Sequence, residues 1–373
     1  MADRRIHALD AFRGFAALWV VLYHVTIRYP YYMLGLNTPD APLIPGLTPG
    51  FTQAEMGVVP VLWFFLISGF VITWTIDRCR TPMDFVVSRL SRLYPAFWAA
   101  LTVSVVLGVV WPLPGTAITA GQVAANATML QEFMGVPAVD GVYWSLTVEL
   151  RFYCYALLIF VLGQWRRVHL VALAWSVLCL AVAVLNGLDV WVPWRVQQML
   201  MAQHGPFLAS GMMVYQLWRR HRVGTSAATL ACSVAAILIG YRLLPAATCI
   251  VAMALLAWSA HGGMRWLAFP PLLWLGAISY SLYLSHEIAT FTLIRALDGV
   301  GTPHGVSVAA AVGAALLLAS AISYGVEQPA MRVIRDAWRL KRPRGDPTDR
   351  TDDRIAGSIA VPPAPPRAPG SAG

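Results

Sequence analysis

Residues 57–76 read GVVPVLWFFLISGFVITWTI, twenty consecutive positions without a charged side chain. An α-helix of about 20 residues spans the hydrocarbon core of a bilayer, which is roughly 30 Å thick. A helix on the surface of a soluble protein keeps a polar face toward water, and this segment has no such face. The stretch therefore predicts a transmembrane helix.

Nine other apolar runs repeat this pattern along the chain. The expected spans are 11–30, 57–76, 93–112, 143–163, 168–187, 203–218, 225–243, 246–261, 272–295 and 305–326. Of the 373 residues, 58% are hydrophobic and only 12% are charged, whereas soluble domains carry roughly 25% charged residues. The sequence predicts an all-α fold, a polytopic membrane helical bundle of about ten transmembrane helices.

The arginines alternate between the expected loops. Cytoplasmic loops are enriched in Lys and Arg, so a cytoplasmic N-terminus would put most of them inside. The inner segments then hold Arg4, Arg5, Arg78, Arg80, Arg89, Arg92, Arg166, Arg167, Arg219, Arg220, Arg222, Arg265 and the run from Arg332 to Arg354. The outer segments hold Arg28, Arg195, Arg242 and Arg295. We expect a multi-pass protein of the bacterial inner membrane with both termini in the cytoplasm. Topology explains the net charge of +9, and no nucleic-acid partner is expected.

The chain divides into a membrane domain at 1–340 and a cytoplasmic tail at 341–373. The tail ends VPPAPPRAPGSAG, a composition typical of disorder. Long outer loops near 31–56 and 113–142 are rich in Pro, Gly and Thr and are suited to contacting substrate. The five cysteines form no CxxC pair and lie mostly in apolar runs, so neither a disulfide framework nor a metal site is inferred.

Arg13 and His24 are ionisable side chains inside the first expected span. Such a residue costs roughly 2.5–3.5 kcal/mol at the centre of a membrane helix, so each requires a partner or a function. At about 100° per residue the two share one face, about 16 Å apart along the axis. Arg13 would lie near the cytoplasmic surface and His24 beyond the midplane. An interfacial arginine and a structural histidine are the alternative interpretations.

Glu149 lies in the fourth expected span, about two turns below the outer surface, at a depth similar to that of His24. A contact between them is geometrically plausible, and the carboxylate would orient the imidazole. Trp144 and Ser145 precede Glu149, and Arg151 follows it. An ion pair between Glu149 and Arg151 is the structural alternative.

Arg89 and Arg92 are three residues apart and therefore share a helix face near the cytoplasmic boundary. With Arg13 they could bind phosphates, because the guanidinium group is a planar fork of donors. Ordinary positive-inside arginines are the alternative. Ser68 and Gly69 form a small-residue position where an acyl chain or, more simply, another helix can approach.

The ninth expected span contains several polar side chains: Tyr280, Tyr283, His286 and Glu287. Tyr283 and His286 are three apart and share a face. In the last expected span Glu327 precedes Pro329, and the proline is expected to end the helix. The candidates for contacting a substrate, or for supporting the residues that do, are Ser68, Trp144, Ser145, Arg151, Tyr280, Tyr283 and His286.

Six segments occur in a characteristic order: LDAFRGFAALWVVLYH (9–24), FFLISGF (64–70), SRLSRLYPAFW (88–98), YWSLTVELRFY (143–153), GAISYSLYLSHE (276–287) and VEQPA (326–330). Together they resemble the acyltransferase-3 family, bacterial integral-membrane O-acyltransferases that modify cell-surface polysaccharides, lipopolysaccharide, Nod factors and some macrolides. The resemblance implies that His24 is the catalytic histidine with Arg13 as its motif partner. It implies further that Arg89 and Arg92 lie beside the acyl-CoA site and that Glu149 is the motif acid.

Two features depart from the family pattern. Leu150 and Arg151 follow Glu149, where members commonly carry a polar or acidic residue and then Gln. No periplasmic SGNH-type domain is expected after the last span, which resembles the stand-alone branch. The expected substrates are acyl-CoA, most simply acetyl-CoA, and a hydroxyl of a sugar or glycan, with no tightly bound cofactor.

In the expected mechanism His24 acts as general base on the acceptor hydroxyl, and an acyl-histidine intermediate is its main variant. A transporter or flippase of a saccharide is the alternative function, because ionisable residues inside membranes also mark transport pathways. A transporter would more often show repeated halves and broken helices, and the sequence shows neither. The identity of the acceptor, the acyl length and the oligomeric state are not readable from the sequence.

Overall fold

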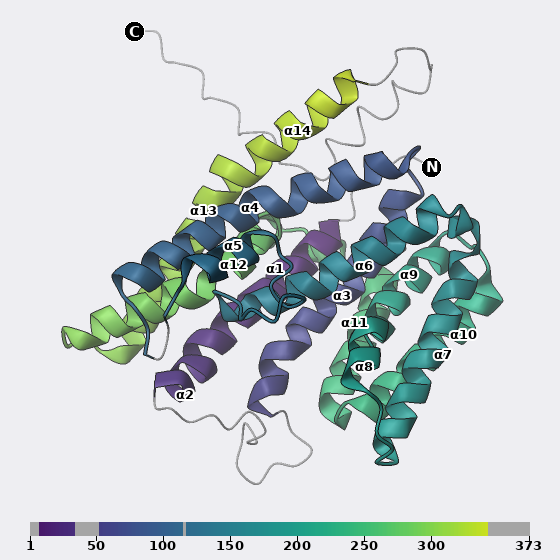
Figure 1. Cartoon of the computed structure of the whole chain (residues 1–373), viewed down its shortest axis with the longest axis horizontal. Coiled ribbons are helices and arrows are strands. Elements are labelled where there is room, and N and C mark those ends of the chain that lie inside the picture. The colour runs from purple at the N-terminus through teal and green to yellow at the C-terminus, as the bar shows by residue number, and fades with distance from the viewer. Residues whose placement is uncertain (1–6, 34–51, 115–116, 342–373) are drawn as a thin grey trace.

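The computed structural model describes residues 7–33, 52–114 and 117–341, and these ranges are mostly helical (Figure 1). Its elements are α1 (His7–Tyr23), the π-helical η1 (His24–Arg28), α2 (Tyr29–Met33), α3 (Gln53–Ile76), α4 (Pro82–Val110), α5 (Ala120–Ala127), η2 (Gly141–Tyr143), α6 (Trp144–Val161), η3 (Gln164–Arg167), α7 (Val168–Gly187), α8 (Trp194–Leu200), α9 (Gly205–Trp218), α10 (Val223–Gly240), α11 (Leu243–Ala260), η4 (Arg265–Leu267), α12 (Pro270–Gly299), α13 (His304–Ile322), the π-helical η5 (Ser323–Glu327) and α14 (Gln328–Leu340). The tail predicted to be disordered lies, from residue 342 on, outside the described residues, as does most of the expected outer loop near 31–56.

Eight helical stretches in the described part of the chain are long and apolar enough to cross a membrane. They include α3, α4, α10 and α11, and they confirm an all-α polytopic membrane bundle. The other two expected spans form the helices α9 and α12 but do not meet the same criteria. With 14 residues α9 is short, and α12 carries the polar stretch SYSLYLSHE. Both pack against several other helices, so their side chains face protein more than lipid.

The helix α4 begins eleven residues before the expected span of 93–112. Thr81 caps it by accepting from the backbone N–H of Asp84, and the Asp84 carboxylate accepts from the backbone N–H of Thr81 in return. This reciprocal capping box satisfies two backbone donors at the helix start. Arg89 and Arg92 therefore lie on a rigid helix and not in a loop.

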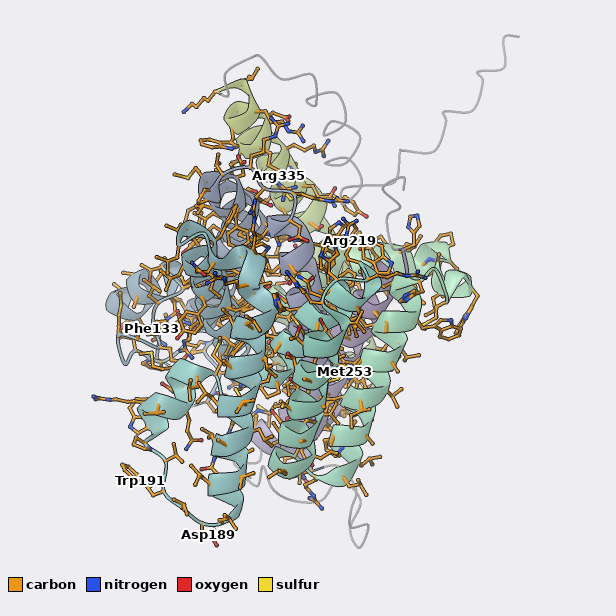
Figure 2. All side chains as sticks on the ribbon, turned by 90° about the vertical axis from the view of Figure 1, so that its right-hand side faces the viewer. Phe133, Asp189, Trp191, Arg219, Met253 and Arg335 are labelled. Carbon is orange, nitrogen blue, oxygen red and sulfur yellow. The ribbon has the colours of Figure 1, made fainter. Side chains whose placement is uncertain are left out.

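The two ends of the bundle carry different side chains (Figure 2). Arg219 and Arg335 lie at one end, whereas Asp189 and Trp191, from the connection between α7 and α8, lie at the other. The sequence assigned Arg219 and Arg335 to one side of the membrane and the connection between α7 and α8 to the opposite side. The bundle has this arrangement.

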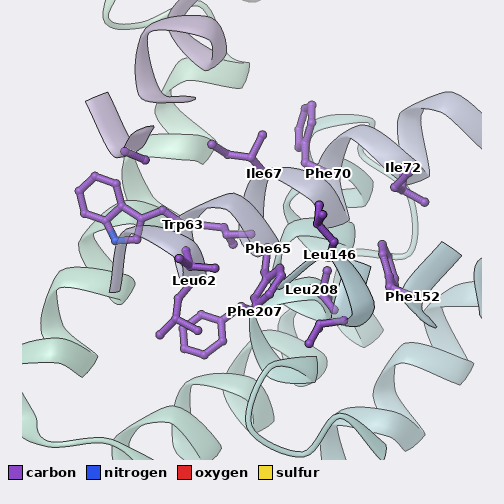
Figure 3. Packing of buried hydrophobic residues seen from close by; sticks show 14 of the residues in the cluster. Leu62, Trp63, Phe65, Ile67, Phe70, Ile72, Leu146, Phe152, Phe207 and Leu208 are labelled. Atoms are coloured by element: carbon purple, nitrogen blue, oxygen red, sulfur yellow. The ribbon is translucent and has the colours of Figure 1, made fainter. Parts of the chain in front are cut away.

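A hydrophobic cluster centred on α3 holds the bundle together (Figure 3). From α3 it takes Leu62, Trp63, Phe65, Ile67, Phe70 and Ile72, from α6 Leu146 and Phe152, and from α9 Phe207 and Leu208. All of them are buried. Burying a side chain of this size away from water stabilises a fold by roughly 1.5–3 kcal/mol, although lipid competes for the same contacts in a membrane.

Glycines set the closest helix crossings. A Cβ on Gly69 of α3 would lie 2.0 Å from the carbonyl oxygen of Leu208, and a Cβ on Gly211 of α9 would lie 2.0 Å from that of Leu66. A Cβ on Gly276 of α12 would lie 2.1 Å from the carbonyl oxygen of Asp10 in α1. Backbones approach this closely only where there is no side chain. The expectation that Ser68 and Gly69 mark a helix contact is confirmed at Gly69.

Substituting Gly69 by alanine is expected to destabilise the bundle by about 1–3 kcal/mol, because the added methyl group meets backbone that must move. Gly313 is the matched control, since it lies in α13 and a Cβ there would have nothing within 4 Å. Thermal unfolding of the purified variants in detergent measures the difference. Equal melting temperatures for Gly69→Ala and Gly313→Ala would contradict the close crossing of α3 and α9.

Candidate active site

Two cavities meet inside the bundle. The larger, about 590 Å³, is lined by six arginines and is here called the arginine cavity. The smaller, about 290 Å³, is lined by His24 and is called the histidine cavity. Val61 and Tyr283 line both. The arginine cavity includes residues of α14 and the histidine cavity includes Tyr31 of α2, and α14 and α2 lie at opposite ends of the molecule in Figure 1.

The arginine cavity is lined by cationic side chains from α1, α4, α14 and the turn after α3. Its arginines are Arg13, Arg78, Arg89, Arg92, Arg335 and Arg339. Arg89 is 8% exposed, and one of its terminal nitrogens donates to the hydroxyls of Thr75 and Ser88 at 3.2 Å each. Its Nε has no hydrogen-bond partner among the described residues. A buried donor without a partner, in a cavity lined by six arginines and only two carboxylates, is suited to an anion.

Arg92 pairs with a carboxylate that the sequence analysis did not connect with it. Its guanidinium forms a salt bridge with Glu327, whose second oxygen accepts from the Ser281 hydroxyl at 2.6 Å. The guanidinium also lies 5.2 Å from the ring centre of Tyr280. Arg92 thus lines the arginine cavity, but its charge is already partly compensated.

The expectation that Pro329 ends the last span is wrong. The helix passes through the π-helical η5, which contains Glu327, and continues as α14 with Pro329 in its first turn. Proline is tolerated there because its missing N–H falls where the π-helical segment already changes the backbone hydrogen-bond pattern. The π-helical segment offsets the helix where the carboxylate meets Arg92, as such segments often do at functional sites.

The helix α14 contributes residues that sequence analysis had assigned only to a basic cluster. Arg335 donates to the Ser91 hydroxyl and to the Ser88 carbonyl, both at 3.2 Å. The Trp338 indole donates to Asp84 at 2.9 Å. These contacts hold α14 against α4 and put Arg335 and Trp338 in the wall of the arginine cavity.

Glu149 lies in the arginine cavity and not beside His24. One carboxylate oxygen accepts from Ser68 at 3.2 Å and from Tyr153 at 2.5 Å. The predicted contact between His24 and Glu149 is therefore wrong. Two residues at similar depth can face different neighbours around the bundle axis, and depth alone does not give that direction.

The partner of His24 is Glu287 of α12. The imidazole Nε2 lies 3.8 Å from the Glu287 Oε2, while Nδ1 lies 2.8 Å from the carbonyl oxygen of Val20. In the neutral tautomer Nδ1 carries the proton for this carbonyl, which leaves the lone pair of Nε2 facing the cavity. The His286 ring packs edge-on against His24 with ring centres 4.7 Å apart. His24 is the first residue of the π-helical η1.

Glu287 occupies space that a glycine provides. A Cβ on Gly141 would lie 2.6 Å from the Glu287 Oε2, so any larger residue would displace the carboxylate. That oxygen has no hydrogen-bond partner within the described ranges. Asp140 also lies close to Glu287 and accepts from Ser104 at 3.1 Å. The pair His286–Glu287 was the only signal in the sequence, and it gave no reason to choose Glu287 over Glu149.

The remaining candidates differ in where they lie. Ser68, Ser145 and Tyr280 line the arginine cavity, and Trp144 lines the histidine cavity. Tyr283 stands between the two, and His286 is fully buried beside His24. Arg151 lines neither cavity.

Arg151 makes contacts that hold parts of the fold together. It donates to the Gln198 carbonyl at 2.8 Å, lies 3.9 Å from the Glu132 carboxylate and covers the ring of Phe133. Among the described residues Arg151 pairs with Glu132 and not with Glu149, so the alternative of an ion pair between Glu149 and Arg151 is wrong. Its contacts join α6 to α8 and to the segment before η2.

The chain matches a family model and two known proteins. The model of the acyltransferase domain family matches residues 6–325. The chain is 28% identical over 303 residues to the exopolysaccharide production protein ExoZ of Rhizobium meliloti, covering 74% of this chain and 90% of that protein. It is 27% identical over 337 residues to nodulation protein 10 of Rhizobium leguminosarum bv. viciae, covering 72% of this chain and 81% of that protein. No solved structure matches significantly. The chain belongs to the acyltransferase-3 family and is a multi-pass membrane acyltransferase.

Proposed function

We propose that the protein transfers an acyl group, most simply acetyl, from acyl-CoA to a hydroxyl of a cell-surface polysaccharide or glycoconjugate. The observation that carries the proposal is the junction of the arginine cavity and the histidine cavity at Val61 and Tyr283. A donor held in one and an acceptor held in the other would meet there. The two relatives, named for exopolysaccharide production and for nodulation, favour a sugar acceptor.

The proposed binding of acyl-CoA depends on the positive charge of the arginine cavity. The nucleotide part of coenzyme A carries several phosphate groups, and guanidinium groups bind phosphate through paired hydrogen bonds. Arg13 and Arg89 line the arginine cavity with Arg335, and the Nε of Arg89 has no partner among the described residues. Arg92 pairs with Glu327 and is not assigned to the phosphates. The thioester then extends toward Tyr283.

The chemical step uses His24 as general base, and the atoms balance without a further reactant. The acceptor oxygen attacks the thioester carbonyl carbon, and its proton passes to Nε2 of His24. The carbon–sulfur bond then breaks, and the proton passes from Nε2 to the sulfur, giving an ester and free CoA thiol. The hydrogen bond from Nδ1 to Val20 holds the tautomer, and Glu287 stabilises the charged imidazolium. Transfer through an acyl-His24 intermediate would use the same groups.

The proposal includes an orientation in the bacterial inner membrane. The end that carries Arg219 and Arg335 faces the cytoplasm, in keeping with the excess of arginine there. Both chain termini then lie inside. Acyl-CoA enters the arginine cavity from the cytoplasm, and the acceptor enters the histidine cavity from the opposite face.

Removing one arginine tests the donor site. Arg13→Met and Arg89→Met are each expected to raise the KM for acetyl-CoA by about tenfold or more, because a charge-assisted hydrogen bond contributes roughly 1.5–3 kcal/mol. With S-acetyl-N-acetylcysteamine, a thioester without phosphates, the same variants should match wild type. Release of free thiol by purified protein, with the host surface glycan as acceptor, measures both.

Arg219→Met is the control, since Arg219 lies at the same end of the bundle but does not line the arginine cavity. It removes the same charge and should leave both KM values unchanged. If Arg13→Met and Arg89→Met lowered activity equally with both thioesters, the arginines would not bind the nucleotide. Transport of a saccharide without acyl transfer would release no thiol at all.

A further inference from the structure

Tyr283 is the polar side chain that separates the two cavities. It lines both of them, together with the apolar Val61. Its ring packs against Phe64 on one side and lies 6.1 Å from the ring of His286 on the other. It precedes Glu287 by one helical turn on α12. The residues that its hydroxyl contacts belong to both cavities, because Ser145 lines the arginine cavity and Val142 lines the histidine cavity.

The hydroxyl belongs to a triangle of polar groups. Tyr283 lies 2.7 Å from the Ser145 hydroxyl and 3.0 Å from the carbonyl oxygen of Val142. The Ser145 hydroxyl is also 3.3 Å from the same carbonyl. Two hydroxyls carry two protons, so the three contacts cannot all be hydrogen bonds at once. If Tyr283 turns its proton into the cavity, Ser145 still donates to Val142 and no buried carbonyl loses its partner.

We propose that the Tyr283 hydroxyl donates a hydrogen bond to the carbonyl oxygen of the thioester and stabilises the negative charge that develops there. The inference rests on the proposed function and adds a catalytic residue to it. When the acceptor oxygen bonds to the carbonyl carbon, the electron pair of the C=O double bond moves to that oxygen, and the proton of the acceptor goes to His24. When the carbon–sulfur bond breaks, the pair returns and Tyr283 keeps its own proton throughout.

Ser145 is a positioning residue in this account. It does not touch the reacting atoms, but it keeps the Val142 carbonyl paired while Tyr283 points to substrate. Without it, Tyr283 must choose between Val142 and the thioester. A hydrogen-bond donor that already points at the developing charge stabilises the transition state more than one that must first reorient. The fixed donor has no reorganisation cost at the moment of reaction.

The test compares acetyl-CoA with its dithioester analogue, in which sulfur replaces the carbonyl oxygen and accepts hydrogen bonds weakly. Tyr283→Phe should lower kcat for acetyl-CoA by about 10²-fold, the usual effect of removing such a donor, with little change in KM. The same variant should transfer from the dithioester within about threefold of the wild-type rate. A purely structural role for Tyr283 predicts equal losses with both donors, and that result would overturn the proposal, as would an unchanged kcat for acetyl-CoA.

Ser145→Ala gives a second measurement should Tyr283→Phe fail to fold. It should lower kcat for acetyl-CoA by about tenfold and again spare the dithioester. Equal losses with both donors would count against the proposal here too. Wild-type protein separates this inference from the proposed function: if it releases no CoA thiol from acetyl-CoA with the host glycan, the proposed function fails, whereas release that is insensitive to Tyr283→Phe overturns the role of Tyr283 alone.

Discussion

Alanine in place of His24 should lower acyl transfer by at least about 10²-fold and leave the bundle folded. General-base catalysis contributes about 10²–10⁴-fold, and no described side chain other than His24 offers an imidazole nitrogen to the histidine cavity. The ring makes one backbone contact and packs against His286, so its loss enlarges a cavity that already exists there. The stability of the variant should therefore change little.

His261 provides a matched control. Its Nδ1 lies 2.9 Å from the carbonyl oxygen four residues earlier, the same backbone contact that His24 makes, but the side chain is exposed and lines neither cavity. The measurement is transfer from radiolabelled acetyl-CoA to the surface glycan in membranes with matched protein levels. His261→Ala should label as wild type does. Labelling by His24→Ala at the wild-type rate would remove His24 from the mechanism.

Breaking the ion pair between Arg92 and Glu327 is expected to have the largest effect on stability. Glu327→Leu leaves the Arg92 guanidinium without its counter-charge and the Ser281 hydroxyl without its acceptor. Removing one partner of a buried pair costs roughly 3–5 kcal/mol, and the lower value applies here because the Arg92 side chain is 19% exposed. Most of that cost is the uncompensated charge and not the lost attraction.

The double variant Arg92→Met with Glu327→Leu distinguishes these contributions. Apolar replacement of both partners is often neutral, so the double variant should recover most of the stability that Glu327→Leu loses. Unfolding in detergent of the two single variants and the double variant gives the coupling. Additive losses would show that the two side chains do not interact in the folded protein.

The sequence predicted the membrane bundle because lipid imposes length and apolarity on every helix that faces it. It was less informative where helices face one another. The segments that became α9 and α12 are surrounded by protein, so hydropathy alone does not define them as it defines α3. The early start of α4 was readable in principle, because Thr81 and Asp84 have the spacing of a capping box.

The sequence gives the order of the site residues along each helix but not the direction in which each side chain points around the bundle. Counting residues placed Arg13 toward one face and His24 beyond the midplane, and the structure puts them in two cavities that meet. Counting residues along the sequence does not predict that Glu287, and not Glu149, faces His24. Which carboxylate faces His24 depends on how α1 and α12 cross. Gly276 permits this crossing because it has no side chain to meet the backbone of α1, and no pattern along the sequence predicts that contact.

Sided membrane vesicles test the central claim, that donor and acceptor enter from opposite faces and meet at Tyr283. Everted vesicles expose the cytoplasmic face, and sealed right-side-out vesicles expose the other. With radiolabelled acetyl-CoA added outside, glycan should be labelled in everted vesicles and not in sealed right-side-out vesicles, and Tyr283→Phe should abolish most of the labelling. Equal labelling from both faces, or labelling from right-side-out vesicles alone, would contradict the account.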